Sequence, residues 1–151
     1  MNAIRNLLKT RAPSATLLIR LLVGCVFLSE GIQKFLFSDQ LGVGRFTKIG
    51  IPSPEVLAPL VGCFEIACGS LLLLGLLTRL AAIPLIVIML VAISTTKIPI
   101  LMRSGFWAMA HEARTDVSML LGSLFLLIVG AGCWSLDARI APRERTGLAP
   151  R

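Results

Sequence analysis

Long apolar stretches alternate with short polar segments along this chain. Four stretches are predominantly apolar, at about residues 16–37, 56–77, 80–101 and 117–133. Because an α-helix rises about 1.5 Å per residue, about 20 residues are needed to cross a hydrocarbon core about 30 Å thick. The pattern therefore predicts an all-α integral membrane protein whose four helices cross the bilayer as an antiparallel four-helix bundle.

The segments between these stretches have the composition of loops. Residues 38–55 are rich in Gly and end with two prolines, and residues 78–79 form a polar hinge between two apolar stretches. Residues 102–116 are amphipathic and include Trp107, which is typical of an anchor at headgroup level, as is Trp134 after the fourth stretch. We expect Pro99 to mark fraying at the end of the third helix. The domain organisation that follows is a basic leader (1–15), a membrane domain (16–137) and a polar tail (138–151).

Composition narrows the class of protein. Hydrophobic residues make up 56% of the 151 positions and charged residues 15%, which is too apolar for a small soluble domain. The formal net charge of +7 comes from short basic flanks rather than from a basic stripe with interleaved aromatic residues, so nucleic acid is not an expected partner. The expected surroundings are the lipid bilayer.

The basic N-terminus also has the form of a signal peptide. The tetrapeptide LVGC at residues 22–25 is similar to a lipoprotein processing box. However, Arg20 interrupts the apolar core, hydrophobic residues resume directly after Cys25, and LVGC occurs again at residues 60–63. An uncleaved first helix is therefore favoured.

The distribution of Lys and Arg predicts an orientation. The side with both termini carries more Lys and Arg residues than the side with the two longer loops. The basic residues on the side of the termini are Arg5, Lys9, Arg11, Arg20, Arg79, Arg139, Arg143, Arg145 and Arg151. Those on the side of the loops are Lys34, Arg45, Lys48, Lys97, Arg103 and Arg114. Cytoplasmic loops are enriched in positive charge. We expect both termini in the cytoplasm and the protein in the inner (cytoplasmic) membrane of a bacterium.

The four cysteines do not form a recognisable framework. Cys25, Cys63, Cys68 and Cys133 all lie in or beside apolar stretches, and no CxxC motif occurs. This argues against a disulfide framework and against a metal site. A redox role for Cys63 and Cys68 stays open, although their spacing places them on different sides of a helix.

Several ionisable residues fall within or beside the apolar stretches. A charged group costs roughly 2.5–3.5 kcal/mol at bilayer depth, so such groups usually face the interior of a bundle. Glu65 lies midway along the second stretch and shares a helix face with Gly62 and Gly69, which would let a neighbouring helix approach closely. Glu30 and Lys34 stand four residues apart and can neutralise each other. Arg20 and Lys34 lie toward opposite ends of the first stretch, where long side chains can reach the interface.

Further polar residues should meet these groups at the same end of an antiparallel bundle. Lys97 ends the third stretch and Asp116 begins the fourth, with the lone His111 in the preceding connector as a candidate proton relay or an ordinary interfacial histidine. The candidate binding cluster is therefore Glu30, Lys34, Glu65, Lys97, His111 and Asp116. A purely structural role, in which buried ion pairs fix helix register, would explain the same residues.

Four motifs resemble those of the DoxX family of small four-helix membrane proteins. They are RLLVGCVFLSEGIQKF (20–35), GIPSP (50–54), LVGCFEIACGSLLLLGLLTRLAA (60–82) and GAGCWSLDARI (130–140). The family is similar in turn to the membrane subunit of a thiosulfate:quinone oxidoreductase. The resemblance places the family's polar positions at Lys34, Glu65 and Asp116. Where relatives commonly have a histidine near the end of the third helix, this chain has Lys97.

The resemblance and the polar cluster together favour an accessory subunit of a membrane redox system. An apolar slot with polar groups at one end suits a quinone headgroup or the protons that accompany electron transfer. Motifs for haem, flavin or iron–sulfur clusters do not occur, so we expect no tightly bound cofactor and only a quinone as ligand. A partner protein of a redox complex and an oligomer are both compatible with this interpretation. The alternatives are a scaffold or assembly factor without catalysis and, third, a small-solute transporter.

Overall fold

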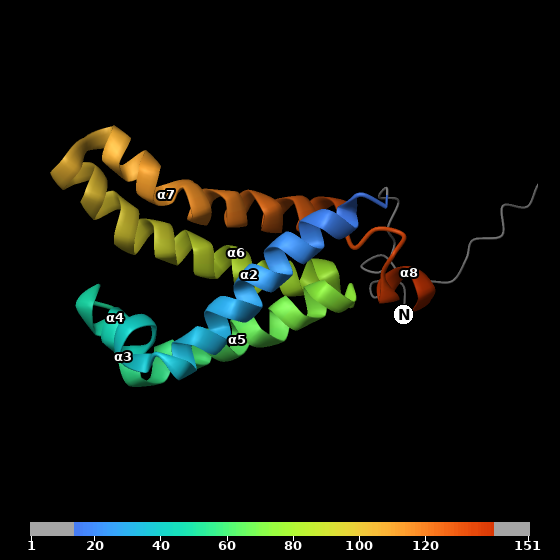
Figure 1. Cartoon of the computed structure of the whole chain (residues 1–151), viewed down its shortest axis with the longest axis horizontal. Coiled ribbons are helices and arrows are strands. Elements are labelled where there is room, and N and C mark those ends of the chain that lie inside the picture. The colour runs from blue at the N-terminus through green and yellow to red at the C-terminus, as the bar shows by residue number, and fades with distance from the viewer. Residues whose placement is uncertain (1–13, 141–151) are drawn as a thin grey trace, which may run out of the picture.

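The computed structural model describes residues 14–140, and every regular element in that range is helical, which confirms the all-α class. Most of the predicted leader and tail lies outside these residues. The elements are α2 (Thr16–Leu36), α3 (Ser38–Leu41), α4 (Val43–Lys48), α5 (Pro54–Leu74), α6 (Thr78–Ala92), the π-helical turn η1 (Ile93–Lys97), α7 (Ile98–Val129) and α8 (Leu136–Ile140) (Figure 1).

Within residues 14–140, three helical stretches are long and apolar enough to cross a membrane. They are Thr16–Leu36, Pro54–Leu74 and the continuous 52-residue stretch Thr78–Val129. Large apolar side chains project outward from them: Leu18, Leu36 and Ile128 are 68%, 69% and 73% exposed. Such outward apolar surface is unfavourable in water and favourable against acyl chains, so this is a membrane protein whose helices contact lipid.

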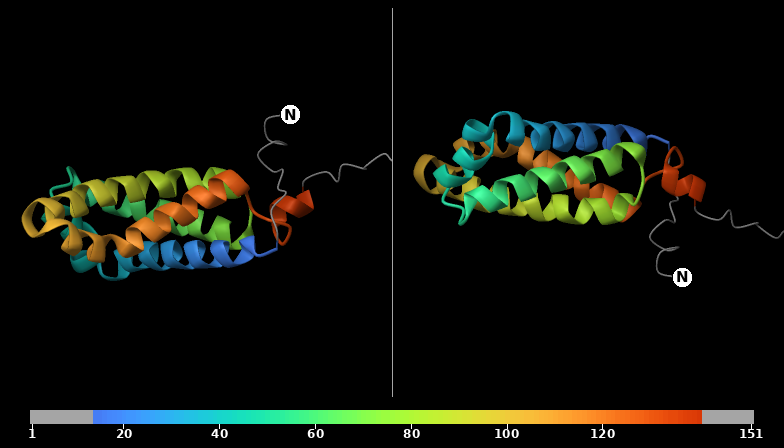
Figure 2. Two further views of the ribbon diagram at one scale, coloured as in Figure 1. Left: turned by 90° about the horizontal axis from the view of Figure 1, so that it is seen from above. Right: turned by 90° about the horizontal axis from the view of Figure 1, so that it is seen from below.

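The longest stretch reverses direction at Gly105. This glycine has φ 82° and ψ 177°, outside the helical region, and α7 then returns alongside α6 (Figures 1 and 2). Glycine tolerates a positive φ because it has no Cβ, so one residue suffices for the reversal. The connector expected over residues 102–116 is thus helical on both sides of Gly105, and the returning helix begins well before residue 117.

The third predicted segment also continues through Pro99 instead of fraying there. The π-helical turn η1 lies immediately before Ile98 and Pro99, and Pro99 falls in the first turn of α7. Proline has no N–H to donate to the preceding turn, so it is tolerated where that donor is not needed. The wider turn absorbs the irregularity without ending the helix.

Helices α2 and α5 make the closest contact in the structure, through glycines. A Cβ on Gly31 would lie 2.8 Å from the carbonyl oxygen of Gly62, and a Cβ on Gly69 would lie 2.8 Å from the backbone nitrogen of Leu28. A Cβ on Gly24 would lie 3.1 Å from the carbonyl oxygen of Gly69. Glycines spaced seven apart on each helix therefore bring the two backbones together, as the small-residue face of α5 predicts.

We expect Gly31→Ala to lower the free energy of unfolding by about 1–3 kcal/mol, because the new methyl group meets backbone atoms that cannot rotate away. Thermal unfolding followed by circular dichroism in detergent would measure the loss. Cys25→Ala, on the same helix at an exposed position, is the matched control and should change the value by less than about 0.5 kcal/mol. Equal stability of the two variants would contradict the close contact.

At the end of the molecule near α8, Arg20 is buried and ties three segments together. Its side chain donates to the carbonyl oxygens of Leu72 (2.9 Å), Leu73 (2.9 Å), Ala131 (2.9 Å) and Trp134 (2.7 Å). Only 2% of Arg20 is exposed, so the expectation that it reaches the membrane interface is wrong. The last carbonyls of a helix lack partners within the helix, and here the guanidinium satisfies those of α5.

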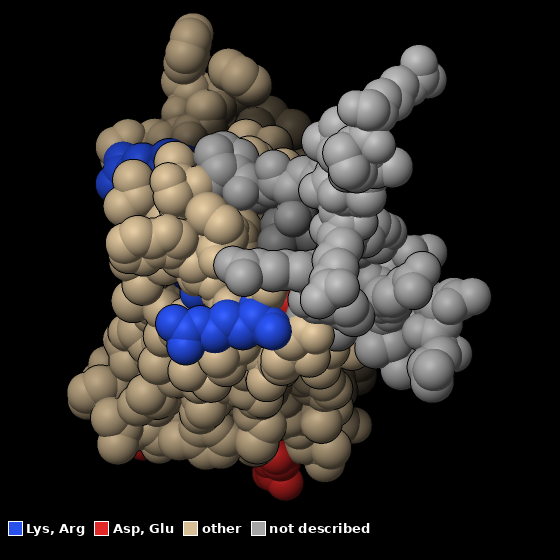
Figure 3. Space-filling model, turned by 90° about the vertical axis from the view of Figure 1, so that its right-hand side faces the viewer, with Lys and Arg blue, Asp and Glu red and all other residues tan. Residues whose placement is uncertain are grey.

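Asp137 of α8 binds the unpaired backbone donors at the beginning of α6. Its carboxylate accepts hydrogen bonds from the backbone nitrogens of Leu77 (2.7 Å) and Thr78 (3.1 Å), the donors that a helix N-terminus leaves unpaired. Asp137 is 2% exposed. Figure 3, which looks onto this end, shows a surface with few acidic or basic side chains among the described residues. Arg20 and Asp137, which join the segments at this end, are therefore internal.

An apolar layer fills the interior between this end and the middle of the molecule. Its members are buried side chains from α2, α5, α6 and α7: Val23, Phe27, Cys68, Leu72, Ala81, Leu85, Met119 and Leu126. Along α2 the layer lies between Arg20 and Lys34, and along α5 it lies next to Glu65. The structure thus separates one polar level near α8 from a second polar level toward α3 and α4.

Candidate functional site

Lys34 and Glu65 form a buried ion pair between α2 and α5. The Lys34 Nζ lies 2.6 Å from Glu65 Oε2, and their side chains are 11% and 2% exposed. Glu65 therefore faces the interior and not the lipid. The expected pairing of Lys34 with Glu30 on the same helix is wrong: the glycines allow α5 to come so close that the carboxylate across the helix contact is the partner of Lys34.

A second ion pair joins η1 to α7. Lys97 Nζ lies 3.0 Å from Asp116 Oδ2, with 9% and 25% of the side chains exposed. The reversal at Gly105 brings these residues together, because it places the returning half of α7 against η1. Asp116 points inward, as its predicted helix face requires.

Between the two ion pairs lies a cavity of about 400 Å³. Most of its wall is apolar and comes from α2, α5, α6, α7 and the α3–α4 segment, namely Val26, Phe27, Leu41, Phe46, Ile49, Ile51, Leu57, Val61, Val87, Ile88, Met89, Val91, Ala92 and Met119. The polar lining residues are Glu30, Lys34, Arg45, Glu65, Thr95, Thr96, Thr115 and Asp116. This is the size and composition of a site for a small, mainly apolar molecule.

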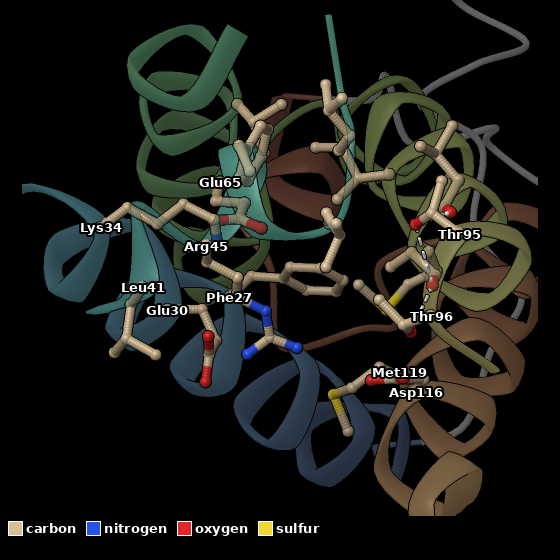
Figure 4. A pocket seen from close by; sticks show the side chains of 18 of the residues that line it. Phe27, Glu30, Lys34, Leu41, Arg45, Glu65, Thr95, Thr96, Asp116 and Met119 are labelled. Carbon is tan, nitrogen blue, oxygen red and sulfur yellow. Dashed lines mark hydrogen bonds and ion pairs between the residues drawn. The ribbon is translucent and has the colours of Figure 1, made fainter. Parts of the chain in front are cut away.

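The polar groups lie on opposite sides of this cavity. Figure 4 shows Lys34 and Glu65 on one side and Thr95, Thr96 and Asp116 on the other. A molecule in the cavity would have polar partners at two opposite ends of its body, with apolar walls between them.

Arg45 reaches into the cavity from α4. Arg45 is an exposed residue, and Figure 4 shows its guanidinium directed between the two polar sides. The segment that carries it, from α3 through α4 to residue 51, packs along α5 and supplies Leu41, Phe46, Ile49 and Ile51 to the wall. Arg45 has no hydrogen bond or ion pair among the residues 14–140, so its donors are available to a ligand.

The structure brings most of the predicted cluster together. The cavity is lined by Glu30, Lys34, Glu65 and Asp116. Lys97 does not line it but forms an ion pair with Asp116. His111 is apart from it: the residue is exposed, and the Arg114 guanidinium lies 2.7 Å from its Nε2. The histidine therefore lies outside the cavity, and its role as a proton relay or an ordinary interfacial residue stays a prediction.

Sequence reasoning assigned no role in the site to Arg45, because residues 38–55 were expected to be a loop. Leu41, Phe46, Ile49 and Ile51 are apolar residues within this polar segment, which was the available signal that it packs against the membrane domain. Thr95 and Thr96 are consecutive, and both line the cavity because they lie in the π-helical turn. That turn gives no simple sequence signal.

The cysteines contribute no cluster to this site. All four are free thiols; Cys68 is buried in the apolar layer, while Cys25, Cys63 and Cys133 are exposed. Over residues 14–140, no group of three or more His, Cys, Asp or Glu side chains is placed to hold a metal ion.

Comparison with known proteins identifies the family of this chain. The model of the DoxX family matches residues 15–98, which include α2, α5, α6 and η1. The chain belongs to the DoxX family. Among curated relatives, this DoxX protein is 57% identical over 144 residues to "Uncharacterized membrane protein Rv3486" of Mycobacterium tuberculosis, with 91% of this chain and 88% of that protein covered.

A second curated relative carries a functional name. The DoxX chain is 28% identical over 132 residues to "Putative oxidoreductase CatD" of Bacillus subtilis, with 87% of this chain and 91% of that protein covered. No solved structure matches. The matched family region contains Lys34, Glu65 and Lys97 and ends before Asp116.

Proposed function

We propose that this DoxX protein is an accessory subunit of a membrane redox system, and that its central cavity binds a quinone headgroup. The observation that carries the proposal is the cavity of about 400 Å³, with apolar walls and polar groups on two opposite sides. A quinone headgroup is a flat apolar ring with oxygens at opposite ends, so its chemistry matches that lining. The name of the Bacillus subtilis relative supports an oxidoreductase system.

The membrane arrangement that we propose has four crossings. The reversal at Gly105 divides the 52-residue helical stretch into two limbs that lie side by side, which supports a four-helix bundle. The excess of Lys and Arg on the side of the two termini supports a cytoplasmic location for both ends. The bacterial relatives, one of them named a membrane protein, support the inner membrane as the location.

Electron transfer in such a system requires a redox protein that this chain would serve. Quinone chemistry needs a donor or acceptor of electrons, and we propose that a partner protein supplies it, with the quinone as the only, loosely held cofactor. Oligomerisation is compatible with the large outward apolar surface.

A scaffold or assembly factor is the second candidate. It is favoured by the two ion pairs, which link α2 to α5 and η1 to α7 and so would fix helix register without any ligand. The two functions differ in one respect: the scaffold does not need an open cavity.

Filling the cavity tests the difference. We expect Ala92→Phe, which places a ring in the cavity, to weaken binding of a short-chain benzoquinone or naphthoquinone to the protein in lipid nanodiscs by at least about tenfold. Leu90→Phe is the matched control, because Leu90 is 52% exposed and does not line the cavity. Isothermal titration calorimetry against empty nanodiscs measures both. A wild-type protein that binds neither quinone would refute the proposed function and favour the scaffold.

A further inference from the structure

The threonines of η1 face the cavity as hydrogen-bond acceptors. Thr95 Oγ1 lies 2.8 Å from the carbonyl oxygen of Val91, and Thr96 Oγ1 lies 2.6 Å from that of Ala92. A carbonyl oxygen can only accept, so each hydroxyl must donate its single proton to the backbone. What each hydroxyl offers to the cavity is its remaining lone pair. Because threonine does not titrate, this polarity does not depend on pH.

Acceptors also predominate among the other polar groups that line the cavity. Glu65 uses Oε2 for Lys34, which leaves Oε1, and Asp116 uses Oδ2 for Lys97, which leaves Oδ1. Glu30 has no hydrogen bond or ion pair among the described residues. Two of these carboxylates thus have one oxygen committed to a lysine and one free.

Donors come from fewer groups. Lys34 has given one of its three protons to Glu65, and Arg45 retains all of its donors within the described part of the chain. The two sides of the cavity therefore differ: donors reach it from α2 and α4, whereas η1 offers only acceptors. The hydroxyl of Thr115 on α7 makes no hydrogen bond within the described residues and can donate or accept. A ligand group that contacts the threonines of η1 must donate to them.

The geometry points to a preference for the reduced form of the quinone: we propose that the cavity binds a hydroquinone more tightly than the corresponding quinone. The inference rests on the proposed function. A quinone carbonyl can only accept a hydrogen bond, so its oxygen lone pairs would face the lone pairs of Thr95 and Thr96 and repel them. A hydroquinone hydroxyl both donates and accepts, so one end can donate to the threonines while the other accepts from Arg45 or Lys34.

The experiment compares ligands that differ only in these protons. Durohydroquinone and duroquinone have the same ring and methyl groups, and binding of each to the protein in nanodiscs is measured by calorimetry under anaerobic conditions. We expect durohydroquinone to bind at least about tenfold tighter. Its dimethyl ether, which has the same ring but no O–H donor, should lose most of that advantage.

Variants of the η1 threonines test whether these residues cause the preference for hydroquinone. Thr95→Val with Thr96→Val removes both acceptors with little change in shape, and we expect the ratio of the two dissociation constants to fall to within about threefold of unity. Ser94→Ala is the matched control: Ser94 makes the same kind of bond to the carbonyl oxygen of Leu90 but is exposed and does not line the cavity. The control should keep the wild-type ratio.

Each outcome decides the matter. Equal or tighter binding of duroquinone to the wild-type protein overturns the preference while leaving the proposed function in place. An unchanged ratio in the folded double valine variant overturns the role of the threonines. Binding of neither ligand refutes the proposed function and the preference with it. If the double variant does not fold, the ether comparison on the wild-type protein still decides.

Discussion

We expect Arg20→Met to lower the free energy of unfolding by about 3–5 kcal/mol, because carbonyl oxygens in two segments, the end of α5 and residues 131–134, lose the donor that satisfies them. The side chain is 2% exposed, so water cannot readily replace the guanidinium. Methionine retains most of the stem volume and removes the charge and the hydrogen bonds. The measurement is the unfolding midpoint in detergent or nanodiscs, followed by circular dichroism.

Arg79→Met provides the control for the loss of positive charge at the same end of the molecule. Arg79 is half-buried and donates from one nitrogen to the carbonyl oxygens of Ile128 (3.0 Å) and Val129 (3.5 Å), so its replacement should cost about 1 kcal/mol. Arg20→Lys should fall between the two variants, because an ammonium lacks the planar fork that reaches several carbonyls at once. Equal loss in Arg20→Met and Arg79→Met would disprove the role of Arg20 as the internal cap of α5.

The second large effect is expected at the ion pair between α2 and α5. Lys34→Met leaves the Glu65 carboxylate buried at 2% exposure without its partner, and we expect a loss of about 3–5 kcal/mol. Lys34→Met combined with Glu65→Leu removes both charges and should recover most of that loss. A double-mutant cycle on the unfolding free energies gives the coupling between the two residues directly.

The same variants separate two roles of the ion pair, helix packing and ligand binding. Lys97→Met is the matched single variant, and it should cost less because its partner Asp116 is 25% exposed. If the recovered Lys34→Met, Glu65→Leu protein still binds the quinone as the wild type does, the pair serves only helix packing. Loss of binding in this stable protein would assign the pair to the ligand site.

The apolar pattern predicted the helical class and the positions of the two N-terminal apolar helices well, because their length and composition are dictated by the bilayer. The segment after the third apolar stretch was harder. A reversal at one glycine leaves no run of turn residues, so Gly105 is indistinguishable from a glycine inside a loop until the backbone is seen. Helix α7 therefore contains residues that were expected to form a connector.

The site was predictable to the extent that charges in apolar segments must face inward. That rule placed Glu65 and Asp116 correctly in the interior, but it could not choose partners. Lys34 was also expected to reach the interface, and that expectation is wrong because its side chain is 11% exposed and pairs with Glu65. Lys34 pairs across the glycine contact rather than along its own helix, and Arg20 finds backbone carbonyls rather than the interface. Both choices depend on the distance between helices, which a single sequence does not encode in its periodicity.

The apolar layer between Arg20 and Glu65 has an electrical consequence in a polarised membrane. A low-dielectric layer carries more of a transmembrane voltage than a polar region of the same thickness, so we expect the cavity, which lies on one side of this layer, to be separated by it from the potential of the opposite solution. Moving one elementary charge across a full 100 mV costs about 2.3 kcal/mol. Charge that moves between Lys34, Arg45 and Asp116 crosses little of that field, so events in the cavity should respond only weakly to membrane potential.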